Sequence, residues 1–145
     1  MPCNCSGLRS TTVRRGSESG EEMAQILVIE DEVALVDVIK TVLTAGGHTV
    51  LEAYDGQTGL EIALRERPDL VIADQMLPLK TGLDVCKELK AARLEPPIPF
   101  MLMTAGNVPV EDACPNAILR KPFSVDELES MVGSLLLAPT RPFFG

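Results

Sequence analysis

Five side chains in this sequence carry groups that could do chemistry together: three carboxylates, a hydroxyl and an amine. They are Glu30, Asp31, Asp74, Thr104 and Lys121. Each lies at or directly after the end of a short apolar run. If those runs are parallel strands of one sheet, their carboxyl ends meet at one edge, where open α/β sheets place their ligand sites. The sequence therefore predicts that the five side chains converge in one pocket.

The chemistry of such a pocket follows from its charges. Carboxylates brought together repel one another, and burying them uncompensated is costly, so a cation must lie among them. An all-oxygen set with room for water suits Mg²⁺, and Glu30, Asp31 and Asp74 are its predicted ligands. A carboxylate can also attack phosphorus and form an acyl phosphate when cations neutralise the transferring oxygens. Lys121 would be the second cation, and Thr104 could donate its hydroxyl to a phosphoryl oxygen.

Each of these residues also has an ordinary structural explanation. Asp31 could cap the helix that follows it, and Asp74 could be a turn residue. Lys121 could be a solvated loop lysine, and Thr104 a strand-end β-branched residue. The coincidence favours chemistry, because four strand ends each carry the required type of side chain in the required order.

The elements that must position these residues follow from the hydrophobic pattern. Short apolar runs alternate with longer amphipathic segments, which is typical of βα units on a parallel sheet with right-handed crossovers. The predicted strands are 26–29, 48–53, 69–73, 98–103 and 117–119. The sequence therefore predicts a five-stranded α/β domain.

Helices are predicted between most of these strands. The first spans 32–45 and stops at Gly46-Gly47, and a second is capped by Asp55 and ends before Pro68. A third runs from about 82 to 93. The last begins at the capping box Ser124-x-x-Glu127.

The fourth crossover is different. Gly106, Pro109 and Pro115 interrupt any long helix between Thr104 and Ala117. We therefore expect an irregular loop or one short helix there.

Composition limits the class of protein. A chain of 145 residues suits one domain, and its net charge of −8 disfavours nucleic-acid binding. No apolar run approaches the roughly 18 residues of a spanning helix, so a soluble protein is expected. Cysteines 3, 5, 86 and 114 show no regular spacing, which fits a reducing cytosol, and Cys86 is interpreted as a small core hydrophobe. Residues 1–24 are predicted to be a disordered tail and 139–145 a C-terminal tail.

Four motifs together resemble the receiver domain of bacterial response regulators, over residues 25–138. They are ILVIEDE at 26–32, PDLVIADQMLP at 68–78, MTA at 103–105 and RKPF at 120–123. The resemblance implies a flavodoxin-like (βα)₅ three-layer sandwich with strand order 2-1-3-4-5. It makes Asp74 the phosphoacceptor, Glu30 and Asp31 the acidic pocket, and the Met76 carbonyl a further Mg²⁺ ligand. Thr104 and Lys121 become phosphate partners, and the Lys121-Pro122 bond is expected to be cis.

The sequence departs from the family pattern in two ways that matter. The segment between Thr104 and Lys121 is short, so the fourth helix is expected to be shortened or missing. The position three before the lysine is Ile118, where an aromatic residue is common. Coupling through rotation of a buried aromatic ring cannot operate here. The face made by the fourth helix, the fifth strand and the fifth helix often carries dimerisation in this family, and that property is not carried over. Glu30 in place of the commoner Asp keeps the charge.

The resemblance implies a cytoplasmic phosphorelay switch that is not an enzyme on other substrates. A histidine kinase or phosphotransfer protein would phosphorylate Asp74, and the output would come from docking onto a downstream protein by a monomer or weak dimer. A phosphorylation-independent binding module would not need all five site residues. An aspartate-nucleophile phosphatase would need a D-x-D on the first strand, and a flavin module would need a non-anionic first loop, whereas this loop is Glu30-Asp31-Glu32.

Overall fold

A computed structural model describes residues 24–106 and 114–137 of the chain. The predicted tails, 1–24 and 139–145, lie almost entirely outside these residues, as does most of the fourth crossover.

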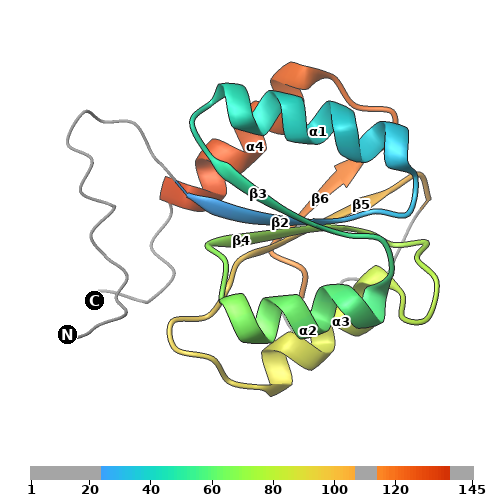
Figure 1. Cartoon of the computed structure of the whole chain (residues 1–145), viewed down its shortest axis with the longest axis vertical. Coiled ribbons are helices and arrows are strands. Elements are labelled where there is room, and N and C mark those ends of the chain that lie inside the picture. The colour runs from blue at the N-terminus through green and yellow to red at the C-terminus, as the bar shows by residue number, and fades with distance from the viewer. Residues whose placement is uncertain (1–23, 107–113, 138–145) are drawn as a thin grey trace.

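The described residues form one parallel sheet at the centre of the molecule (Figure 1). Its strands are β2 (Gln25–Ile29), β3 (Thr49–Ala53), β4 (Leu70–Asp74), β5 (Phe100–Thr104) and β6 (Ala117–Arg120). They pair in the order β3-β2-β4-β5-β6, which is 2-1-3-4-5 in chain order. The predicted flavodoxin-like topology is confirmed. The central strands β4 and β5 are buried at every position, as expected for near-continuous apolar strands covered on both faces.

In the described part of the chain, helices cover both faces of the sheet (Figure 1). α1 (Val33–Ala45) and α4 (Val125–Leu137) pack on one face, and α2 (Gly56–Glu66) and α3 (Gly82–Ala91) on the other. Side chains of alternate strand positions therefore divide between two core clusters, one under each helix pair. This confirms the three-layer sandwich.

Helix starts follow the predicted capping residues. The Asp55 carboxylate accepts a hydrogen bond from the Thr58 amide at 2.7 Å. In the box before α4, the Ser124 hydroxyl accepts from the Glu127 amide at 3.0 Å, while the Glu127 carboxylate accepts from the Ser124 amide at 2.9 Å. Both predicted caps are therefore confirmed. Each cap supplies acceptors for backbone amides that have no partner within the helix.

Some element boundaries differ from those predicted. The third helix ends at Ala91 instead of 93, and it starts from a capping box of Thr81 and Asp84 that the sequence reading overlooked. The fourth strand begins at Phe100, two residues late, because Pro99 cannot donate to a sheet. The Lys121-Pro122 bond is cis, as predicted.

The cysteine interpretation was wrong. Cys86 on α3 is buried, as expected of a small core hydrophobe, but its sulfur is bonded to Cys114 in a disulfide. The two Cα atoms lie 6.3 Å apart although 28 residues separate them in sequence. Only the packing of α3 against the residues that lead into β6 brings the pair together, so sequence spacing could not reveal it.

Gly82 is a point where the fold leaves no room for a side chain. A Cβ atom there would lie 2.5 Å from the Asp74 carbonyl oxygen and 2.5 Å from Leu102. We expect Gly82→Ala to lower the free energy of unfolding by about 1–3 kcal/mol, because the Asp74 backbone must shift. Urea denaturation would measure this.

The matched control is Gly133→Ala in α4, where an added Cβ meets nothing within 4 Å. That change should be neutral or stabilising by up to about 1 kcal/mol. Equal stability of the two variants would contradict the close approach of Gly82 to Asp74.

Candidate functional site

The predicted site residues lie at the carboxyl edge of the sheet. Glu30 directly follows β2, Asp74 ends β4, Thr104 ends β5 and Lys121 follows β6. Register pairing places the ends of neighbouring strands side by side, with Asp74 opposite Met103 and Thr104 opposite Arg120. Parallel pairing thus brings residues more than ninety positions apart in sequence into one pocket.

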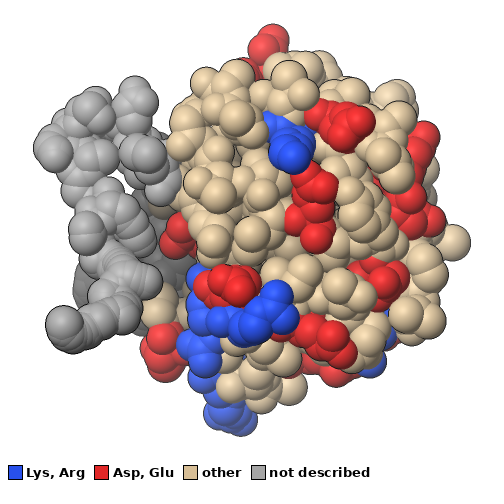
Figure 2. Space-filling model, in the orientation of Figure 1, with Lys and Arg blue, Asp and Glu red and all other residues tan. Residues whose placement is uncertain are grey.

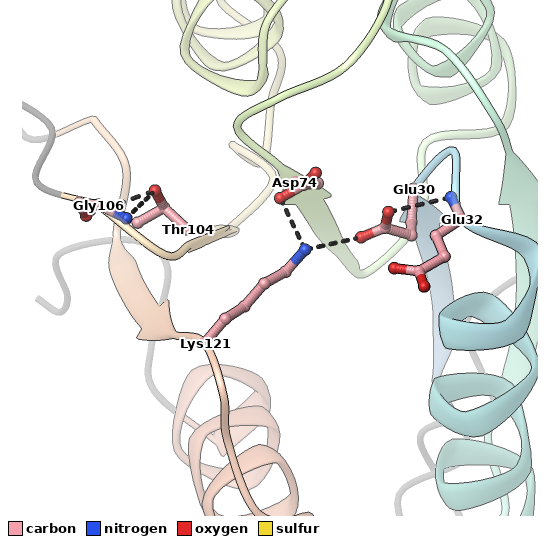
Figure 3. Close-up of polar contacts among 6 residues, drawn as sticks. All are labelled: Glu30, Glu32, Asp74, Thr104, Gly106 and Lys121. Carbon is pink, nitrogen blue, oxygen red and sulfur yellow. Dashed lines mark hydrogen bonds and ion pairs between the residues drawn. The ribbon is translucent and has the colours of Figure 1, made fainter.

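Lys121 joins two of the acids (Figure 3). Its Nζ lies 3.1 Å from Asp74 Oδ1 and 3.3 Å from Glu30 Oε1. Asp74 and Glu30 are buried, with 5% and 1% of their surface exposed, so solvent screens these ion pairs little. The side chain of Lys121 reaches toward both acids from the end of β6, as predicted.

Glu30 is the most deeply buried of the acids. Burial raises its pKa, a hydrogen bond from the Glu32 amide opposes this, and the charge of Asp74 raises the pKa further. Lys121 lowers it, but the net pKa stays above the ordinary value. The ionised form of Glu30 is therefore held at a cost that another cation would relieve.

Lys121 remains charged. Burial lowers its pKa, but the hydrogen bond and charge of Asp74, with the charge of Glu30, outweigh burial and raise the pKa above the ordinary value. One cation therefore faces two buried carboxylates.

The acids are arranged as a metal site would require. Glu30, Asp31 and Asp74 each offer a carboxylate oxygen, and these oxygens all lie within 4.8 Å of one another. Glu30 and Asp74 are buried while Asp31 is exposed, so the site opens to solvent on the Asp31 side. An oxygen-only set that is open to water fits a hard divalent cation such as Mg²⁺.

Thr104 is buried at the end of β5, but its hydroxyl is hydrogen-bonded to Gly106 and not to the acids of the pocket. Its hydroxyl accepts from the Gly106 amide at 3.1 Å and lies 3.4 Å from the Gly106 carbonyl oxygen (Figure 3). Arg120 donates to the same carbonyl at 2.9 Å. The hydroxyl must leave these partners before it can bind a ligand in the pocket. The sequence reading missed Gly106 and Arg120, because nothing in their types marks them as partners of Thr104.

Two other predicted positions are placed by the structure. Met76 lies just after β4 and is exposed, and a ligand role for its carbonyl stays a prediction. Ile118 lies within β6, opposite Leu102, so no aromatic ring occupies that position.

Comparison with known proteins identifies the family of this chain. The family model described as the response regulator receiver domain matches residues 26–133. The chain is 34% identical over 124 residues to the DNA-binding dual master transcriptional regulator RpaA of Synechocystis sp., covering 82% of this chain and 52% of that protein. It is 39% identical over 107 residues to the transcriptional regulatory protein DltR of Streptococcus agalactiae, covering 72% and 48%. The chain thus spans about half the length of these relatives.

Solved structures agree. A response regulator receiver domain protein from Clostridium thermocellum superposes with a TM-score of 0.69 at 28% identity, covering 79% of this chain and 94% of that one. The receiver domain of a sensor histidine kinase from Pseudomonas aeruginosa, described with a magnesium ion coordinated in its active-site cleft, gives a TM-score of 0.72 at 25% identity, covering 80% and 99%. Fold, motifs and relatives coincide, and this chain belongs to the response regulator receiver domain family.

Proposed function

We propose that this receiver accepts a phosphoryl group on Asp74 and signals by changing the surface around Thr104. The observation that carries the proposal is the contact of Lys121 with both Asp74 and Glu30 at the open edge of the sheet. This contact joins two buried carboxylates to one cation, and Asp31 lies beside them on the solvent side. A carboxylate nucleophile with cations to neutralise the transferring oxygens is the set that phosphoryl transfer to a carboxylate requires.

Glu30, Asp31 and Asp74 would hold Mg²⁺, with the Met76 carbonyl as a further ligand. The spacing of their oxygens and the raised pKa of Glu30 support this, as does the magnesium ion described for the Pseudomonas aeruginosa receiver. When bound, the ion neutralises charge on the oxygens of the transferring group.

The transfer itself is a substitution at phosphorus. An oxygen of the Asp74 carboxylate forms a bond to phosphorus while the bond from phosphorus to the donor breaks, so the phosphoryl group moves to the protein. The ammonium of Lys121, already 3.1 Å from Asp74, would face the incoming anion. The hydroxyl of Thr104 would exchange its contacts with Gly106 for a phosphoryl oxygen, which moves the end of β5 and the segment that follows.

The phosphodonor would be a histidine kinase or phosphotransfer protein, as in other two-component systems. A cavity of about 390 Å³ beside the pocket is lined mainly by apolar side chains and reaches Lys121. Among them are Leu35 and Val38 of α1 and Phe123 after β6. A partner that brings its phosphoryl group to Asp74 would bury an apolar surface here.

The remaining assignments also belong to the proposal. We place the chain in the cytoplasm as a monomer or weak dimer, with a receiver domain over 25–138 and output by docking onto another protein. No helix among the described residues has the length and apolarity to cross a bilayer. Figure 2 shows acidic side chains spread over one face with basic ones beside them, which does not favour a phosphodiester backbone as the partner of this domain.

The proposal is tested by incubating the protein with acetyl phosphate and Mg²⁺ and measuring its intact mass. The expected result is the addition of one phosphoryl group, lost when the divalent cation is chelated. An unmodified mass at saturating donor would instead favour a binding module that works without phosphorylation.

Mg²⁺ affinity should depend on pH through Glu30. Its pKa is raised in the folded protein, so the ionised carboxylate destabilises the fold, and this cost disappears as the pH falls. Since the metal binds the ionised form, affinity should fall as the pH drops through the raised pKa. Calorimetric Mg²⁺ titrations from about pH 4, near the ordinary pKa of a Glu side chain, up to about pH 8 would measure this.

Glu30→Gln is the matched variant for this pH series. It should bind Mg²⁺ more weakly at high pH and with a shallower pH dependence, because the titrating ligand is gone. A wild-type affinity that does not change over the range would contradict the assignment of Glu30 as a ligand.

A further inference from the structure

The disulfide between Cys86 and Cys114 joins α3 to the segment that leads into β6, at the edge of the sheet where β5 and β6 begin. Cys86 lies in α3, and Cys114 lies three residues before β6. They are 5% and 3% exposed and belong to the core cluster that includes Phe100 and Leu102 of β5. The bond thus ties the end of the fourth crossover to the helix layer under β5.

The described ends of this crossover show how it is attached. At its start, Gly106 is held by Thr104 and by Arg120. At its end, the Asn116 amide donates to the Phe100 carbonyl at 3.0 Å, and the Asn116 side chain accepts from the Phe100 amide at 2.9 Å. Cys114 adds a covalent attachment ten residues after Thr104.

We propose that Cys86 and Cys114 form a redox-modification site whose oxidation state sets how firmly the start of β6 is held and, through the contact of Arg120 with Gly106, how freely Thr104 moves. The disulfide restrains the segment that leads into β6 against α3, and the dithiol releases it. The existence of the redox site is independent of phosphorylation, whereas its effect on Asp74 rests on the proposed function. Coupling between the two sites must be reciprocal, so phosphorylation would also shift the thiol–disulfide equilibrium.

The packing of α3 does not depend on the bond alone. A free cysteine packs as a small hydrophobe, and α3 also contributes Leu83 and Leu89 to the same core cluster. Because both residues are almost fully buried, an exchange partner reaches them only after local unfolding of the core around them. In the cytosol, where we place this chain, disulfides are usually transient or redox-sensing.

The redox step balances with a low-molecular-weight disulfide as oxidant. One cysteine thiolate attacks the oxidant, forming a mixed disulfide and releasing one small thiolate. The second cysteine thiolate attacks the mixed disulfide, closes the Cys86–Cys114 bond and releases the other small thiolate. Two electrons pass to the oxidant, and the two cysteine protons end on the two small thiols. A small dithiol reverses the step.

The first test is a redox titration of the full chain, with Cys3→Ser and Cys5→Ser to leave only this pair. The protein is equilibrated with mixtures of reduced and oxidised glutathione, alkylated and weighed by mass spectrometry. A single two-electron transition under native conditions is expected, with two alkyl groups on the reduced form. A bond that can be reduced only in denaturant would overturn the proposal, as would a pair that stays reduced in every mixture.

The second test measures the restraint on the segment that leads into β6. Hydrogen exchange at the Asn116 amide should be at least tenfold faster in the reduced protein, because its hydrogen bond to Phe100 loses the neighbouring restraint. The Leu27 amide in β2 is the internal control and should not change. Equal exchange at Asn116 in both oxidation states would overturn the proposal even if the pair titrates.

The third test is phosphorylation by acetyl phosphate. The reduced protein should be phosphorylated at least threefold faster than the oxidised one, and the double variant Cys86→Ser/Cys114→Ser should match the reduced protein in both buffers. Equal rates in the two states would overturn the coupling to Asp74. Absence of any adduct in both states would refute the proposed function instead, and the exchange at Asn116 would still decide the redox site.

Discussion

We expect the Asp74→Asn variant to acquire no phosphoryl group from acetyl phosphate and Mg²⁺ under conditions that modify the unaltered protein. The amide has the shape of the carboxylate and can still accept a hydrogen bond from Lys121, but it is neutral and a poor nucleophile. The fold should survive, because one of two buried, mutually repelling carboxylates has been removed. Intact-mass spectrometry and thermal unfolding would measure the two effects.

Asp37→Asn is the control for this experiment. Asp37 is exposed on α1, and its replacement removes the same charge without touching the pocket. This variant should be phosphorylated like the original protein. A phosphoryl adduct on Asp74→Asn at the normal rate would mean that another residue accepts the group.

We expect Lys121→Met to be phosphorylated by acetyl phosphate about 100-fold more slowly, the usual effect of removing one group that stabilises developing charge. The variant also leaves Glu30 and Asp74 without the cation that lies 3.3 Å and 3.1 Å from them. Mg²⁺ affinity should therefore rise, since the ion no longer competes with an ammonium group. Slower phosphorylation together with tighter metal binding is a result that simple unfolding would not give.

Lys40→Met provides the comparison. Lys40 pairs with Glu52 at 2.7 Å on the surface of α1 and β3, outside the pocket. Its loss should change neither the phosphorylation rate nor the Mg²⁺ affinity. If Lys121→Met behaved in the same way, Lys121 would have no part in the transfer.

Most of the fold could be predicted because each strand is a short apolar run and each helix has a recognisable end. β4 and β5 are apolar up to the Asp74 and Thr104 that end them, and a sheet covered on both faces buries such continuous apolar strands. The caps at Asp55 and Ser124 could be predicted because residues with side-chain acceptors are favoured where the first amides of a helix lack partners.

The candidate site could also be predicted, because parallel strands bring their carboxyl ends to one edge whatever their separation in sequence. What could not be predicted was the environment of each residue. The sequence Glu30-Asp31 does not indicate that Glu30 is buried and Asp31 exposed. Glu30 is buried at the edge of the sheet, and that burial is the main cause of its raised pKa.

The disulfide is the clearest failure of the sequence reading. The irregular spacing of the cysteines did not match a disulfide framework, but spacing in sequence gives no information on the distance between two cysteines in the folded protein. Cys86 meets Cys114 because α3 packs against the segment that leads into β6. Ile118 lies in β6 where the family commonly has an aromatic residue, so a signal from Asp74 cannot pass through a rotating ring at that position.

The most direct test is a crystal structure of the full chain with Mg²⁺ and beryllofluoride, a mimic of the phosphoryl group. We predict the ion among Glu30, Asp31 and Asp74, and the mimic on an Asp74 oxygen in contact with Lys121 and with a Thr104 hydroxyl released from Gly106. A mimic bound away from Asp74, or a metal that none of the three acids contacts, would contradict the account.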